Sequence, residues 1–106
     1  KDIKGVTVFA EPNPEYFSNH WLSAITIDDE LTGFSREDLR LAFEKENIES
    51  RPLWKPMHLQ PVFKDYLYFG TNNAEKIFEN GLCLPSGSNL TALEKKRIAS
   101  VIQFFK

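Results

Sequence analysis

Cysteine is almost missing from this 106-residue sequence, which contains only Cys83. A single cysteine cannot form a disulfide within the chain, and because Cys83 lies in an apolar run we expect a small buried side chain. The two histidines, His20 and His58, are far apart in the sequence, so no spacing typical of metal ligands is present. The sequence therefore predicts no disulfide and no metal site.

Long apolar runs and an excess of one charge are also lacking. No stretch approaches the roughly 20 apolar residues that a membrane span needs, and no signal-peptide pattern opens the chain. Lys and Arg total 13 against 15 for Asp and Glu, which gives a formal net charge of −2. This balance argues against a nucleic-acid or anionic-membrane partner. We therefore expect a soluble, cytoplasmic protein.

Glycine is scarce, and signatures of self-sufficient catalysis are missing. With 5 glycines, the chain has no phosphate-binding loop of the kind found in nucleotide-binding proteins. His20 with Asp28 or Asp29 could be drawn as an acid–base pair, and Ser50, Ser86 or Ser88 as a nucleophile with His58 as its base. Neither arrangement has a local signature such as a nucleophile elbow. The sequence thus predicts no catalytic or cofactor-binding residue within this chain.

What is present suffices for one modest hydrophobic core, since 42% of the residues are apolar and 13% are aromatic. We expect a single domain over residues 1–106, cut from a longer parent protein because the chain begins at Lys1 without an initiator methionine. Strands are predicted near residues 5–11, 20–27, 48–52 and 82–84, and helices near residues 36–47, 72–80 and 91–104. The fold class is α+β, with a small three- to four-stranded sheet whose first two strands pair antiparallel. Each helix has one apolar stripe, so the helices should cover one face of this sheet.

Capping signals mark the starts of the three helices. In each, a Ser, Thr or Asn is followed three residues later by an acidic residue that can bond back to the cap. The pairs are Ser35 with Asp38, Asn72 with Glu75, and Thr91 with Glu94. Gly81 is predicted to end the second helix in a left-handed conformation.

The segment of residues 51–63 is unlike the rest of the chain. Its three prolines remove backbone donors and exclude a helix or a central strand, so we expect an irregular loop. Ordered loops that mix aromatic and cationic groups are frequent binding sites, which makes Arg51, Trp54, Lys55 and His58 candidates. Alternatively, the loop only packs along a sheet edge and His58 satisfies backbone carbonyls within it.

A family resemblance rests on residues 19–22, 51–63 and 81–91, and above all on the string Arg-Pro-Leu-Trp-Lys-Pro-Met-His of residues 51–58. In these segments the chain resembles the C-terminal domain of the DegT/DnrJ/EryC1/StrS family of sugar aminotransferases. The resemblance implies the small domain of a fold-type-I enzyme that uses pyridoxal phosphate. It further implies a homodimeric parent that aminates a nucleotide-linked keto-sugar from glutamate, as in polysaccharide biosynthesis.

The resemblance also implies a division of labour between two domains. In this family the lysine that binds the cofactor lies in a preceding large domain, so this chain alone should be inactive and should contribute substrate recognition. His58 is the first candidate for that role, and Arg51, Trp54 and Lys55 follow, because cations suit diphosphate or carboxylate oxygens. Two alternatives stay open. One is a free-standing α/β module that holds a protein or peptide partner with its Pro-rich loop, and the other is a pyridoxal phosphate-dependent sugar dehydratase of the same family.

Overall fold

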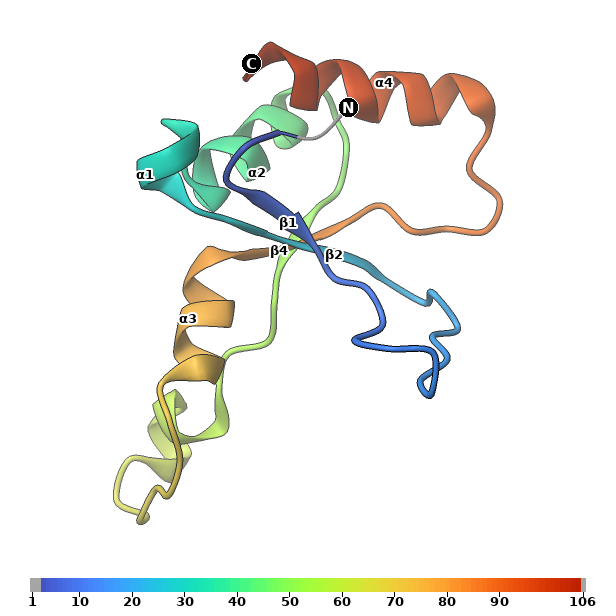
Figure 1. Cartoon of the computed structure of the whole chain (residues 1–106). Coiled ribbons are helices and arrows are strands. Elements are labelled where there is room, and N and C mark those ends of the chain that lie inside the picture. Colours follow the sequence, from blue (N-terminus) through green and yellow to red (C-terminus); the bar gives the residue numbers. More distant parts are fainter. Residues whose placement is uncertain (1–2, 106) are drawn as a thin grey trace.

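The computed structural model describes residues 3–105, and its centre is one sheet of four short antiparallel strands (Figure 1). The strand order is β1-β2-β4-β3, and the antiparallel pairing predicted for the first two strands is confirmed. The bounds are β1 (Val6–Val8), β2 (Ser23–Ile27), β3 (Arg51–Pro52) and β4 (Gly81–Leu84). The Pro-rich segment therefore starts as an edge strand, where a missing backbone donor is tolerated.

Within residues 3–105, four α-helices and two 3₁₀ turns surround the sheet. They are α1 (Asp29–Thr32), α2 (Arg36–Lys45), α3 (Asn73–Asn80), α4 (Ala92–Phe104), η1 (Met57–Leu59) and η2 (Pro61–Phe63). Both turns lie in the segment expected to be an irregular loop, and its prolines limit them to single turns. Within residues 3–105, no helix is long and apolar enough to cross a membrane.

The core lies between the sheet and the pair α2 and α4. Alternation in β2 points Ile25 and Ile27 to the same face, and Ile25 lies opposite Leu82 of β4 in the strand register. Leu39 and Phe43, one turn apart on α2, cover these residues and are almost completely buried. This arrangement confirms the α+β class, with a small sheet covered by helices.

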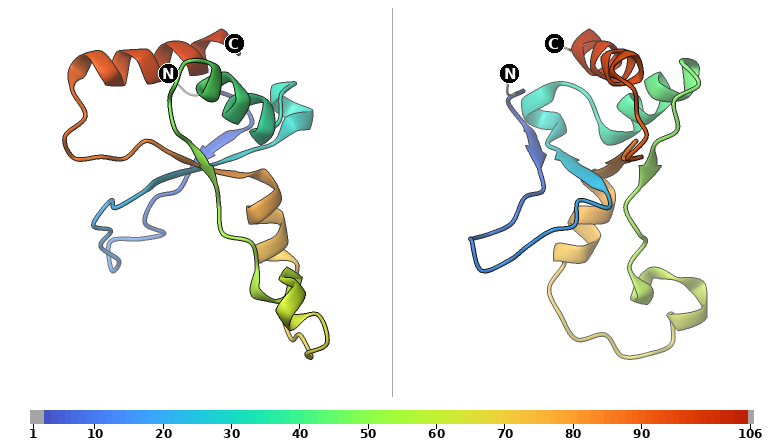
Figure 2. Two further views of the ribbon diagram at one scale, coloured as in Figure 1. Left: turned by 180° about the vertical axis from the view of Figure 1, so that it is seen from behind. Right: turned by 90° about the vertical axis from the view of Figure 1, so that its right-hand side faces the viewer.

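Helix α3 departs from the expected arrangement, because it does not join α2 and α4 over the core. Figures 1 and 2 show α3 on the opposite side of the strands from that pair. None of its residues is buried, and none belongs to the core cluster. The centre of the Phe78 ring of α3 lies 5.9 Å from the guanidinium carbon of Arg36 in α2. The chain from residue 53 to residue 80 forms a projection that we call the arm (Figures 1 and 2).

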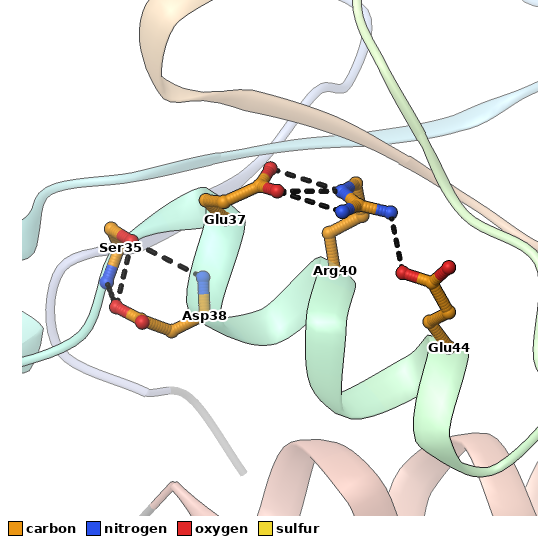
Figure 3. Close-up of polar contacts among 5 residues, drawn as sticks. All are labelled: Ser35, Glu37, Asp38, Arg40 and Glu44. Carbon is orange, nitrogen blue, oxygen red and sulfur yellow. Dashed lines mark hydrogen bonds and ion pairs between the residues drawn. The ribbon is translucent and has the colours of Figure 1, made fainter.

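The capping boxes predicted for α2 and α4 are confirmed. At α2, the Asp38 backbone N–H donates to Ser35 Oγ at 3.2 Å, and the Ser35 N–H donates to Asp38 Oδ2 at 2.8 Å (Figure 3). Arg40 pairs with Glu37 at 2.7 Å and with Glu44 at 3.0 Å on the outer face of α2. The hydrogen bond from Arg40 lowers the pKa of Glu37. These charges stabilise an exposed helix face, as its polar pattern indicates.

Two local predictions for α3 are wrong. Asn72 makes no side-chain cap, and the carboxylate expected to bond back to it, that of Glu75, bonds to His58. Gly81 is extended, with φ −96° and ψ 143°, and begins β4 directly after the helix. Steric space explains the glycine, because a Cβ at this position would overlap the Leu53 side chain and the Ile77 carbonyl.

Candidate functional site

A cleft of about 580 Å³ lies beside the edge strand β3, and we call it the β3 cleft. Its walls are β3 with the residues on either side of it, the connection from β4 to α4, and the chain just before β2. This volume is typical of a small-molecule site. The polar and aromatic groups that line it include Trp21, Ser50, Arg51, Trp54, Ser86 and Arg97.

Two long-range hydrogen bonds hold the walls of the β3 cleft in place. Ser86 Oγ accepts from the backbone N–H of Ser23 at 2.7 Å and donates to the Leu84 carbonyl at 2.7 Å. Arg97 donates from Nη2 to the Glu46 carbonyl at 2.7 Å, which ties α4 to the carboxyl end of α2. The cleft is therefore built into the fold, because both its loop wall and its helix wall are anchored.

The β3 cleft combines two exposed aromatic rings with charges of both signs, because the carboxylates of Glu49 and Glu94 line it together with Arg51 and Arg97. Trp21 and Trp54 are 72% and 69% exposed, so their rings are available for stacking. Arg51 pairs with Glu49 at 2.6 Å, and its guanidinium has further N–H groups that can donate to an oxyanion. Within the described residues, the buried Ser50 Oγ has no hydrogen-bond partner. Burial raises the pKa of Cys83, which keeps this thiol protonated and argues against a nucleophilic role.

The structure divides the four predicted site residues into two groups. Arg51 and Trp54 line the β3 cleft, whereas Lys55 and His58 do not. The Lys55 side chain is exposed, and its backbone carbonyl accepts from the Gln60 amide at 3.3 Å. His58 lies in the arm, where its Nε2 is 2.9 Å from a carboxylate oxygen of Glu75. Its partner is thus a carboxylate of α3, not a backbone carbonyl of its own loop.

The catalytic pairs that could be drawn on the sequence are not brought together. His20 is 3.7 Å from the carboxylate of Glu11. Asp28 caps α1 instead of meeting His20. The hydroxyl of Ser86 is engaged by backbone groups at the β3 cleft, while His58 is held in the arm. Neither pair therefore forms a proton-transfer unit in this fold.

The surroundings of the lysines show whether this chain can hold pyridoxal phosphate, the cofactor that the family resemblance implies. A lysine that carries this cofactor needs a desolvated setting, and the ring nitrogen needs an acidic partner. Every lysine within residues 3–105 is exposed, and no charged residue in that range is buried. The described residues therefore do not fit the cofactor.

Several residues at these sites are missed by sequence reasoning. Trp21 falls in the strand predicted near residues 20–27, where an aromatic side chain is common, yet it is exposed in the β3 cleft. Arg97 carries no local signal because its partner Glu46 is 51 positions away. Glu75 does stand out as an acidic residue in the first turn of a helix, but that position suggests a cap and not a histidine partner.

Comparisons with known proteins agree with the resemblance. The model of the DegT/DnrJ/EryC1/StrS aminotransferase family matches residues 1–103. EpsN of Bacillus subtilis (strain 168), named as a pyridoxal phosphate-dependent aminotransferase, is 43% identical over 96 residues, which cover 84% of this chain and 24% of EpsN. GDP-perosamine synthase of Vibrio cholerae is 30% identical over 90 residues, covering 82% of this chain and 24% of that protein.

A solved structure shows the same fold. The aminotransferase TlmJ from Streptoalloteichus hindustanus superposes with a TM-score of 0.79 at 15% identity, covering 95% of this chain and 26% of TlmJ. The chain thus spans about a quarter of the length of the curated relatives that it matches.

Proposed function

This chain belongs to the DegT/DnrJ/EryC1/StrS aminotransferase family, and we propose that it is the C-terminal small domain of an enzyme that aminates a nucleotide-linked keto-sugar. The observation that carries the proposal is the match over residues 1–103, together with relatives that include a GDP-perosamine synthase. The parent takes its amino group from glutamate and acts as a cytoplasmic homodimer. This function fits the family better than a free-standing peptide-binding module.

In this proposal the catalytic lysine belongs to the rest of the parent protein. Pyridoxal phosphate, when bound there, supplies the electron sink that transamination requires. The exposed lysines of this chain do not replace that residue. The chain contributes substrate recognition and is inactive by itself.

The groups that recognise the sugar nucleotide come from the Pro-rich segment. Arg51 presents a planar fork that pairs with diphosphate oxygens, and Trp54 offers a ring face from the same wall of the β3 cleft. Lys55, exposed next to Trp54, adds a second cation. His58 offers a ring nitrogen for a hydrogen bond to the substrate and is assigned to binding, not to acid–base chemistry.

The experiment that tests the function is an assay of the full-length parent with a nucleotide-linked keto-sugar and glutamate. The expected products are the nucleotide-linked amino-sugar and 2-oxoglutarate. Loss of a sugar hydroxyl without amination, in a parent that lacks the cofactor lysine, would instead identify a dehydratase of the same family.

Substitution of His58 in that parent tests the assignment of substrate contacts. We expect His58→Ala to raise KM for the sugar nucleotide by about tenfold, because it removes a hydrogen bond between the ring and the substrate. KM for glutamate and thermal stability should change little. Lost stability with unchanged sugar kinetics would contradict a binding role and indicate a purely structural histidine.

A further inference from the structure

The two halves of the arm are joined by one polar contact between side chains. His58 lies on η1 in the outgoing half, residues 53–63, and Glu75 lies in the first turn of α3 on the way back. Their atoms Nε2 and Oε1 are 2.9 Å apart, and the two side chains are only 17% and 27% exposed. Within residues 3–105, this is the only side-chain hydrogen bond between the outgoing half and α3. A charge-assisted bond with limited access to water is stronger than a typical surface contact.

A third residue, Tyr68, closes the same contact from the tip of the arm. Its ring stacks on His58 with centroids 3.7 Å apart and planes inclined by 19°. Its hydroxyl donates to the Thr71 carbonyl at 2.6 Å, which holds the ring in position. Gly70 permits this approach, because a Cβ there would lie 2.7 Å from the Tyr68 hydroxyl. His58 is therefore held by Glu75 at one ring edge and by Tyr68 on one face.

The contact defines the chemistry that His58 can offer. A carboxylate at Nε2 requires a proton on that nitrogen, so Nδ1 is the nitrogen left for another partner. Within the described chain, Nδ1 has no hydrogen-bond partner. Glu75 thus sets both the tautomer of the ring and the direction in which it faces, as carboxylates do for histidines at other functional sites.

We propose that Glu75 and Tyr68 are positioning residues: they clasp His58 and so hold the arm in the shape in which it meets the substrate. Little else restrains the tip, since Tyr66, Leu67 and Phe69 are 73%, 86% and 87% exposed. Loss of the clasp should therefore loosen the arm without loosening the core. This inference rests on the proposed function, in which the segment of residues 51–58 faces the sugar nucleotide.

The test compares Glu75→Ala with Glu75→Gln and Glu79→Ala in the full-length parent, by hydrogen exchange and by kinetics. Glu75→Ala should speed amide exchange in residues 57–72 by about tenfold, since a hydrogen bond to a charged group is lost, while exchange in β2 and β4 is unchanged. It should also raise KM for the sugar nucleotide with little change in kcat. Glu75→Gln keeps an acceptor for Nε2, so its amide exchange rates and its KM for the sugar nucleotide should be close to those of the wild type. Glu79→Ala is the matched control, because it removes a charge one turn along α3 and should alter neither the exchange rates nor KM.

Coupling to the other members of the clasp completes the test. Added to His58→Ala, the Glu75→Ala change should have no further effect on exchange, because the contact is already lost. Tyr68→Ala should loosen the arm more than Tyr68→Phe, which keeps the stacked ring. If amide exchange in residues 57–72 is unchanged in Glu75→Ala, the proposed clasp is wrong. If exchange is faster but KM for the sugar nucleotide is unchanged in an active enzyme, the proposed positioning role is wrong. A parent that does not aminate sugar nucleotides would refute the proposed function, while the exchange data would still decide the clasp.

Discussion

Gly81 is constrained by its neighbours and not by its backbone angles. Its φ of −96° is open to any residue, so conformational freedom does not explain the glycine. The explanation is that α3 passes into β4 without a linking residue, which brings the Ile77 carbonyl and the Leu53 side chain against the Gly81 Cα. At this residue, the base of the arm depends on the absence of a Cβ.

We expect Gly81→Ala to lower the free energy of unfolding by about 1–3 kcal/mol, the range typical of an inserted group that meets fixed backbone. Chemical denaturation of the two proteins would measure the difference. Gly87→Ala is the matched control, since the nearest atoms to a Cβ there belong to the side chain of Asn89, which is exposed and can move. Equal stability of Gly81→Ala and the wild type would show that the junction between α3 and β4 is less tight than described.

At the scale of elements, α2 and α4 are the two helices that start with complete capping boxes, and their caps respond to pH. Hydrogen bonds from the side chain and then the backbone of Ser35 lower the pKa of Asp38 from its ordinary value of 3.8. Hydrogen bonds from the side chain and backbone of Thr91 lower the pKa of Glu94 from 4.5 in the same way. A lowered pKa in the folded state means that the ionised carboxylate favours folding.

The sign of this linkage gives a prediction. Both caps contribute fully to the free energy of unfolding when the pH is above the ordinary pKa values of the two carboxyl groups. This contribution is lost as the pH falls through the lower pKa values that these groups have in the folded state. The melting temperature should therefore vary little from about pH 7 to pH 5 and fall below about pH 4. Thermal melts of wild type and of an Asp38→Asn, Glu94→Gln double variant would show this, and the variant should have a lower melting temperature at neutral pH and a shallower fall in acid. An identical acid profile in both proteins would assign the pH dependence to other carboxylates.

At the scale of the whole molecule, two projections leave apolar side chains exposed on the side away from α2 and α4. One is the loop between β1 and β2, and the other is the arm (Figure 2). Phe17 in the first and Phe69 in the second are almost fully exposed. Exposed apolar surfaces such as these are typical of sites that contact another protein or domain. We therefore expect this side of the chain to meet the rest of the proposed parent protein.

The exposed lysines lead to a prediction for the chain by itself. When it is mixed with pyridoxal phosphate and reduced with borohydride, mass spectrometry should find only scattered, low-level labelling, because no lysine within residues 3–105 is desolvated. The same chain in urea is the control and should give a similar pattern, since its lysines are accessible in both states. One saturating adduct, at Lys55 for example, would contradict the assignment of the cofactor lysine to the rest of the parent.

The sequence by itself determined those features of this protein whose partners are close together in the chain. The capping boxes at Ser35 and Thr91 join residues three positions apart. The string of residues 51–58 was specific enough to indicate the family. Each of these signals is complete within a few residues, so no knowledge of the fold is needed to read it.

Only the tertiary structure decided which side chains meet across the chain. It placed Arg51 and Trp54 in the β3 cleft and separated them from His58, although all three belong to one segment. It gave Glu75 a histidine as partner 17 positions away, where the local pattern predicted a cap. The physical reason is that a polar side chain has several possible hydrogen-bond partners of similar energy, and the path of the backbone selects the one within reach.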